Sequence, residues 1–111
     1  MVKQGDIIKI NFNPQKGHEQ AGYRPAIVVS NNTFNRFSKL VFVCPITNSI
    51  DNFPLHIKLD TRTVTTGIIL CEHLRSLDIE ARDYKIVEKL PKDILQNVID
   101  IIFSEIDIEN N

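Results

Sequence analysis

The chain has 111 residues, of which 42% are apolar and 24% charged, and its net charge is −1; these values predict one globular domain over residues 1–111 with a single modest core. The near-neutral charge argues against binding nucleic acid through bulk electrostatics, and no apolar run approaches the ~20 residues of a membrane span. The first residues have no signal-peptide pattern, so the sequence favours a cytoplasmic protein with no membrane contact.

The first half of the chain predicts three strands. Residues 6–12 alternate, with Ile8, Ile10 and Phe12 on one face, which is typical of a half-buried strand. After a polar loop at Asn13–Gly22, the runs Ala26–Val29 and Leu40–Ile46 are apolar at consecutive positions, so both faces of these strands should be covered. Pro45 predicts an edge or a bulge at the end of the second run. The stretch between the runs, residues 31–38, predicts a turn or one short helical turn.

The second half predicts three further strands and a helix. Leu55–Leu59 alternates with His56 facing outward, and we assign His56 no role. The other two strands are expected at Gly67–Leu74 and Tyr84–Leu90. Pro91 then starts a helix whose apolar residues recur at three- and four-residue steps. Six short strands followed by one helix predict an α+β or small-barrel domain that is mainly antiparallel.

Charge is unevenly distributed. Residues 1–92 hold all thirteen Lys and Arg and nine acids, a balance of +4, whereas residues 93–111 hold five acids and no base. A phosphate-binding surface on the body and an ordinary solvated surface explain this equally well. Cys44 and Cys71 lie in apolar runs and are expected to be buried thiols. No second Cys or His pair completes a zinc site, so no metal and no cofactor are expected.

The most informative stretch is Gly17–Ser30, which reads GHEQAGYRPAIVVS. Its glycines permit tight turns, and Pro25 suits the first position of a strand. A rigid strand would thus hold Arg24 at its start, with an acid and an imidazole on the adjoining loop, which makes this loop a candidate reactive site. From Gly5 to Ser30 the chain resembles the MazF/PemK (Kid) family of toxins from bacterial toxin–antitoxin pairs. The resemblance continues through NRF at 35–37, CPIT at 44–47, TTG at 65–67 and LRSLD at 74–78.

This resemblance implies a fold, an activity and partners. The fold would be a small, SH3-like, curled antiparallel β-barrel with a C-terminal helix (α+β), assembled as a homodimer. The activity would be metal-independent, sequence-specific cleavage of single-stranded mRNA by a ribose 2′-hydroxyl, and a cognate MazE/PemI-like antitoxin would neutralise it. Arg24 and Thr47 match the family's catalytic arginine and threonine.

The general base stays open between Glu19 and His18. The imidazole needs no special environment to be half neutral near physiological pH, whereas the carboxylate needs a raised pKa or strong positioning. Because Glu19 matches the more regular family position, it ranks slightly first. The expected RNA contacts are Gln20, Lys16, Asn35, Arg36, Asn48, Glu72, Arg75 and Arg82. Arg75 and Arg82 serve equally well as salt-bridge partners of Asp78 and Asp83.

The chain departs from the PemK/Kid branch at one point. That branch has an Arg-x-Asp pair in the strand after TTG, and the matching residues here are Leu70 and Glu72. Leu70 can do no acid chemistry, while Glu72 keeps a carboxylate that could also serve as the base. The competing reading is a non-enzymatic CcdB-like or SH3-like protein-binding module. The CcdB type depends on a C-terminal tryptophan, and this chain has no Trp.

Overall fold

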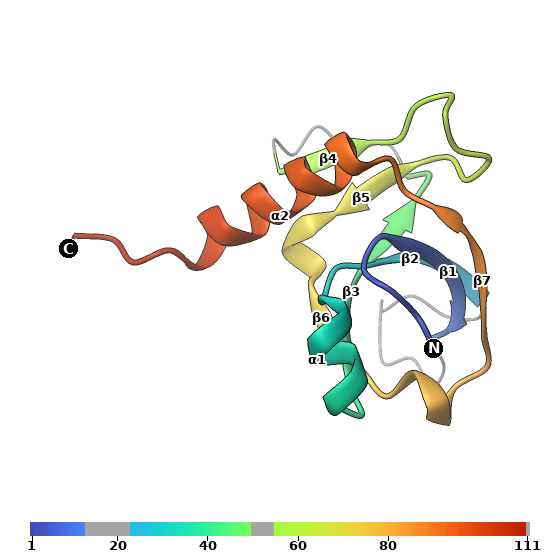
Figure 1. Cartoon of the computed structure of the whole chain (residues 1–111). Helices are drawn as coiled ribbons and strands as arrows, with labels where there is room; N and C mark the ends of the chain where they lie inside the picture. Colours follow the sequence, from blue (N-terminus) through green and yellow to red (C-terminus); the bar gives the residue numbers. More distant parts are fainter. Residues whose placement is uncertain (13–22, 50–54, 111) are drawn as a thin grey trace.

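The computed structural model describes residues 1–12, 23–49 and 55–110. It contains a curled antiparallel sheet, a short helix beside it and a long C-terminal helix (Figure 1). In chain order the elements are β1 Asp6–Asn11, β2 Tyr23–Val28, α1 Asn32–Phe37, β3 Val41–Thr47, β4 His56–Lys58, β5 Ile68–Leu70, the 3₁₀ turn η1 Cys71–His73, β6 Arg75–Leu77, the 3₁₀ turn η2 Ile79–Ala81, β7 Tyr84–Lys89 and α2 Lys92–Ile106.

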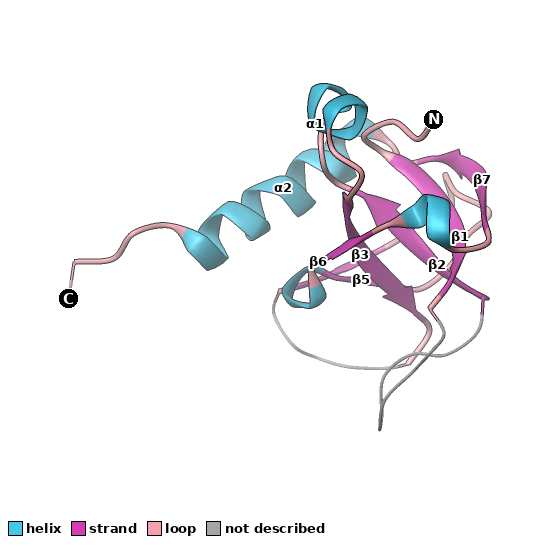
Figure 2. Cartoon of the chain, turned by 90° about the horizontal axis from the view of Figure 1, so that it is seen from below, coloured by secondary structure: helices cyan, strands magenta, loops and turns pink. Residues whose placement is uncertain are grey.

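The sheet is antiparallel throughout, with strand order β4-β5-β3-β2-β1-β7 and with β6 also paired to β3. The expected α+β class with a C-terminal helix is confirmed. Among the described strands, however, no pairing joins β4 to β7, so the sheet curls without closing into a barrel (Figure 2). The short outer strands β4 and β5 leave too few backbone groups to complete a ring.

Both faces of β2 are buried from Ala26 on and both faces of β3 from Val43 on, as their continuous apolar runs predict, but Leu40 and Phe42 at the start of the second run are 41% and 37% exposed. Ile27 and Val29 belong to the cluster packed against α2, while Ala26 and Val28 belong to a second cluster inside the curl. The first cluster also contains Ile7, so β1 is covered on its second face at its start. The curl of the sheet and α2 thus cover both faces within one chain, and these strands need no partner surface.

Pro45 lies inside the sheet, which corrects the expectation of an edge or bulge. It is level with Ala26 of β2, and β3 has partners on its other side as well. Those partners change at this point: β6 pairs with residues 41–43 and β5 with residues 46–47. A residue without an N–H fits where the ladder on one side is interrupted.

The strand expected at Gly67–Leu74 is broken. It ends at Leu70, turns through η1 and resumes as β6, a seventh strand that the apolar pattern did not reveal. Cys71 begins the turn and is fully buried, as is Cys44, and both are free thiols. Burial is the main reason that the pKa of the Cys71 thiol rises to about 12 and that of Cys44 rises further. The cysteines are therefore inert core residues, as expected.

Helix α2 packs against the sheet from its first turn to Ile102. Pro91 caps it rather than forming its first turn, and Ile94 and Val98 are buried against the sheet. The last turn of the helix and the residues after it leave the body and point into solvent (Figures 1 and 2). Phe103 and Ile106 are 64% and 69% exposed there. Within the described ranges, no helix is both long and apolar enough to cross a membrane.

Candidate active site

Arg24 and Thr47 meet on neighbouring strands. The β2–β3 register pairs Ala26 with Pro45, and continuing it by two residues brings Arg24 level with Thr47. Because side chains alternate along a strand, both point to the face of the curled inner cluster, which contains Ala26 and Val43. Arg24 is exposed and Thr47 half-buried. The fold thus places a guanidinium and a hydroxyl side by side at the solvent end of this face.

Two further arginines gather at the same end of the sheet, around three consecutive residues of the chain. Arg24 pairs with Ile10, Arg82 donates from Nη1 to the carbonyl oxygen of Asn11 at 3.0 Å, and the Arg75 guanidinium lies 5.3 Å from the centre of the Phe12 ring. The cation–π contact holds Arg75 over a buried ring. Three cations beside a hydroxyl, two of them held by contacts to Asn11 and Phe12, form a site suited to a phosphate.

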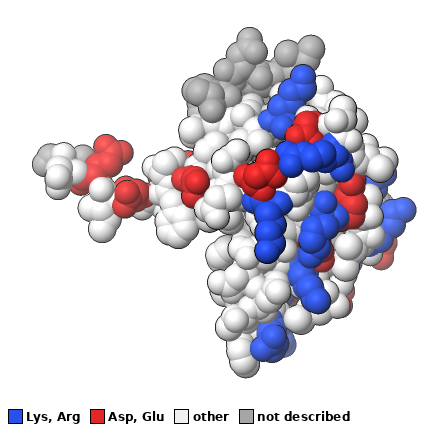
Figure 3. All heavy atoms as spheres, turned by 45° about the horizontal axis from the view of Figure 1, so that its top comes forward, with Lys and Arg blue, Asp and Glu red and all other residues white. Residues whose placement is uncertain are grey.

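This arginine cluster, defined as Arg24, Arg75 and Arg82, was not evident as a unit from the sequence. Salt bridges from Arg75 to Asp78 and from Arg82 to Asp83 are absent from the ion pairs of the described residues. The available signal was the charge balance of the body. Figure 3 shows basic side chains interspersed with acidic ones on the body, with only acidic and uncharged residues on the projecting end of α2.

The TTG motif supports the Thr47 end of β3. Gly67 has φ +125°, and an added Cβ would lie 2.5 Å from the Thr47 carbonyl oxygen. The Thr66 hydroxyl donates to Asn48 Oδ1 at 3.2 Å and so holds Asn48, the residue after Thr47. Glu88 of β7 anchors the turn by accepting hydrogen bonds from the backbone N–H groups of Val64 and Thr65 and from the Thr65 hydroxyl. Burial acts to raise the pKa of Glu88, but these bonds outweigh it and hold the pKa below its usual value.

His56 does not face outward, which corrects the sequence-based expectation. Its side chain is only 4% exposed, and Nε2 lies 2.6 Å from Oε2 of Glu72 in η1. His73 Nε2 lies 3.7 Å from the same oxygen. Glu72, expected as an RNA contact, is therefore held by an imidazole. The signal was missed because the pairing spans sixteen residues and depends on the unpredicted turn at Cys71.

Breaking the His56–Glu72 contact should give non-additive losses of stability. We expect His56→Ala and Glu72→Ala each to lower the free energy of unfolding, and the double variant to lose less than their sum by about 0.5–3 kcal/mol. Urea unfolding of the four proteins measures this coupling. Equal and additive effects would show that the contact is not formed in solution. The pair His73→Ala and Glu72→Ala, with its longer separation, is the matched control.

The remaining predicted residues are placed as follows. Asn35 serves the fold, because it is 6% exposed and its amide nitrogen donates to the Ser30 carbonyl while its oxygen accepts from the Ser30 hydroxyl; it is not positioned to contact RNA. Arg36 is exposed on α1. Leu70, which stands where the PemK/Kid branch has an arginine, is 7% exposed and therefore belongs to the core. Four predicted residues lie outside the described residues: Lys16, His18, Glu19 and Gln20.

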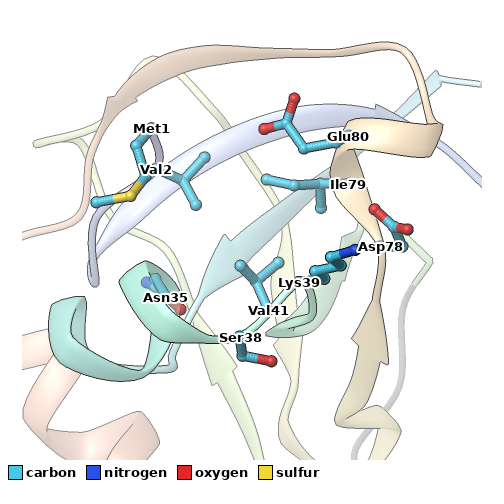
Figure 4. Close-up of a pocket in the computed structure, with 9 residues that line it drawn as sticks. All are labelled: Met1, Val2, Asn35, Ser38, Lys39, Val41, Asp78, Ile79 and Glu80. Atoms are coloured by element: carbon cyan, nitrogen blue, oxygen red, sulfur yellow. The ribbon is translucent and has the colours of Figure 1, made fainter.

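A hollow of about 430 Å³ lies apart from the arginine cluster, between the N-terminus, α1 and η2 (Figure 4). Its apolar wall includes Val2, Val41 and Ile79. Several of its polar groups already serve the fold: Asp78 caps η2 and Glu80 accepts from the Tyr84 hydroxyl. We assign this hollow no role. The described part of the chain contains no group of three His, Cys, Asp or Glu side chains that could hold a metal ion.

Comparisons with known proteins agree on one family. Residues 3–103 match the family described as PemK-like, MazF-like toxin of type II toxin–antitoxin system. The chain is 34% identical to endoribonuclease PemK of Escherichia coli, over 88% of this chain and 77% of that protein. It is 32% identical to endoribonuclease MazF of Staphylococcus epidermidis, over 70% and 69%.

Solved structures give the same answer. The crystal structure of MazF from Deinococcus radiodurans superimposes with a TM-score of 0.87 at 33% identity, covering 96% of this chain and 97% of that one. A MazE–MazF structure from the same organism gives 0.85 at 32% identity, covering 97% of each chain. The match over nearly the whole chain, in sequence and in fold, establishes that this chain belongs to the PemK-like, MazF-like family of toxins of type II toxin–antitoxin systems.

Proposed function

We propose that this protein is a metal-independent endoribonuclease toxin that cleaves single-stranded mRNA in the cytoplasm and thereby inhibits translation. The observation that carries the proposal is the β2–β3 register, which, continued two residues past Ala26 and Pro45, aligns Arg24 with Thr47 at the end of the sheet that Arg75 and Arg82 reach. In the proposed reaction, a ribose 2′-oxygen loses its proton and attacks the adjacent phosphorus. The bond from phosphorus to the 5′-oxygen then breaks, leaving a 2′,3′-cyclic phosphate and a 5′-hydroxyl.

Arg24 suits the stabilisation of charge in this reaction. Its planar fork can bind two phosphoryl oxygens at once, and its pKa above ~12 makes it a poor proton donor. Thr47 can donate its hydroxyl to a third oxygen, because its Oγ1 otherwise accepts a 3.2 Å bond from the Ser49 N–H. Each fixed donor of this kind is worth about 10²–10³ in rate in enzymes of known mechanism.

The base is proposed to be Glu19, with His18 as the alternative, and both lie outside the described residues. Glu72 is the third candidate. The His56 contact supports a positioned carboxylate at Glu72, which follows β5, the strand that pairs with Thr47 through Ile68. Glu19 is preferred because it matches the more regular position of the family.

The chemistry of the RNA ends tests the proposal. Purified protein incubated with a long mixed-sequence RNA in EDTA should produce fragments with 5′-hydroxyl and 2′,3′-cyclic phosphate ends. End-specific labelling before and after phosphatase treatment distinguishes these ends from 5′-phosphates. Activity that is lost in EDTA and restored by Mg²⁺, or 5′-phosphate products, would overturn the mechanism. A protein-binding module, the alternative function, would leave the RNA intact.

We further propose that the protein acts as a homodimer. The support is the exposed apolar side chains in two places: the end of α2, with Phe103 and Ile106, and the region of α1 and β3, with Phe37 at 81% and Phe42 at 37%. Large exposed apolar patches on small proteins mark interaction sites. Light scattering at micromolar concentration should give twice 12.7 kDa. A monomer that cleaves RNA at the full rate would refute the dimer but not the chemistry.

A cognate antitoxin of the MazE/PemI type is proposed as the second partner. The MazE–MazF structures of Deinococcus radiodurans superimpose on this chain at 26–32% identity, which supports the same kind of partner here. An antitoxin that occupied the arginine cluster would block RNA from Arg24 and thereby neutralise the toxin.

A further inference from the structure

Two lysines face each other on the outer side of the sheet, next to an exposed tyrosine. Lys9 of β1 is directly opposite Lys85 of β7, and both are exposed. On its other side, Lys9 is opposite Pro25, and Tyr23 lies two residues from Pro25 along β2. Residues two apart share a face, so all three side chains project from the same face. Together they line a shallow hollow of about 340 Å³.

This arrangement is unfavourable without a ligand. Like charges directly opposite each other on neighbouring strands destabilise a sheet. Among the described residues, neither Lys9 nor Lys85 has a carboxylate within ion-pair distance, whereas Lys89, further along β7, is paired with Asp6 at 3.1 Å. An anion bound between the two ammonium groups would turn their repulsion into attraction.

Tyr23 adds an exposed aromatic ring to this pair of cations. Tyr23 is 50% exposed, whereas Pro25 and Ile27, the next residues along the same face of β2, are half-buried and buried. It lies diagonally from Lys9, at about 7–8 Å between Cα atoms for such neighbours. A base-stacking ring beside backbone-binding cations is the arrangement that binds single-stranded nucleic acid without sequence preference.

We propose that Lys9, Tyr23 and Lys85 form a second contact site for single-stranded RNA, in which Tyr23 stacks on a base and the lysines bind the adjoining phosphates. The site is separate from the arginine cluster, because consecutive strand residues point to opposite faces and Arg24 follows Tyr23 directly. The choice of RNA as the ligand rests on the proposed function.

Binding of a non-cleavable strand tests this site without requiring cleavage. The probe is a fluorescein-labelled 2′-O-methyl oligouridine of twenty nucleotides, followed by anisotropy at several salt concentrations. The Lys9→Gln/Lys85→Gln variant should lower the slope of log affinity against log salt by about 1.4, since each phosphate contact on a single strand contributes about 0.7. Tyr23→Leu should weaken binding about fivefold or more, and Tyr23→Phe should restore it, because the ring supplies the stacking.

The matched control removes the same charge elsewhere. Lys39→Gln/Lys92→Gln changes two exposed lysines outside this site and should leave the slope close to that of the wild type. Equal slopes for both double variants, or an unchanged affinity in Tyr23→Leu, would overturn the proposal. Poly-glutamate that binds this site in place of the oligouridine would assign it to an acidic peptide and equally overturn it. Because the probe cannot be cleaved, failure of the nuclease mechanism leaves these outcomes unaffected.

Discussion

Replacing Arg24 by alanine should lower the single-turnover rate of RNA cleavage by about a hundredfold or more, because one fixed donor to a transition-state oxyanion contributes about 10²–10³ in rate. Arg24→Lys should stay badly impaired, since it keeps the charge but loses the bidentate fork. Rates should be measured on a short RNA at saturating enzyme, with folded protein confirmed by circular dichroism. Cleavage by Arg24→Ala within about tenfold of wild type, or about 1.4 kcal/mol of barrier, would remove Arg24 from the catalytic role.

Arg62→Ala is the matched control for this loss of charge. Arg62 is bound on the surface between Asp60 and Asp93, at 2.8 Å and 2.9 Å, and exposed pairs of this kind contribute only about 0–1 kcal/mol. Like Arg24→Ala, the variant removes one positive charge, but from a place outside the arginine cluster. It should cleave RNA at the wild-type rate. A comparable loss in Arg62→Ala would mean that overall charge, not the position of Arg24, governs the rate.

The sequence predicted those parts of the fold that depend on local pattern. The strands at β1, β2, β3 and β7 and the helix α2 follow from apolar runs and periodicity, and the structure confirms them. The break at Cys71 could not be predicted in this way, because Ile68–Leu74 is apolar enough to continue as a strand. The turn instead depends on β3 exchanging one partner for another beside Pro45, which is a tertiary constraint.

The same division holds for the candidate site. Arg24 and Thr47 were found by resemblance, and their meeting on one face follows from a register that no local pattern specifies. The contacts of Arg75 with Phe12 and of His56 with Glu72 join residues far apart in the chain. For Asn35, the local sequence does not distinguish a binding residue from a structural one. Its structural role depends on the buried hydrogen bonds to Ser30, which the sequence does not reveal.

Gly67→Ala should both destabilise the protein and damage the site. A residue with a Cβ is strained at φ +125°, at a cost of about 1–3 kcal/mol, which for a domain of this size lowers Tm by at least about 4 °C. The new Cβ would also lie 2.5 Å from the Thr47 carbonyl oxygen, about 1 Å inside ordinary contact, and the backbone of β3 must move to admit it. A misplacement of about 1 Å at a reacting group can cost about 10² in rate.

Gly5→Ala separates these two effects. Gly5 has φ +92°, so alanine is strained there as well, but its nearest neighbour is the Leu95 side chain at 3.3 Å, which can turn aside. Gly5 also precedes β1, at the end of that strand opposite the arginine cluster. We therefore expect both variants to lose thermal stability, and only Gly67→Ala to lose cleavage when both are assayed well below their Tm. Equal cleavage by the two variants would show that the TTG turn supports the fold and not the position of Thr47.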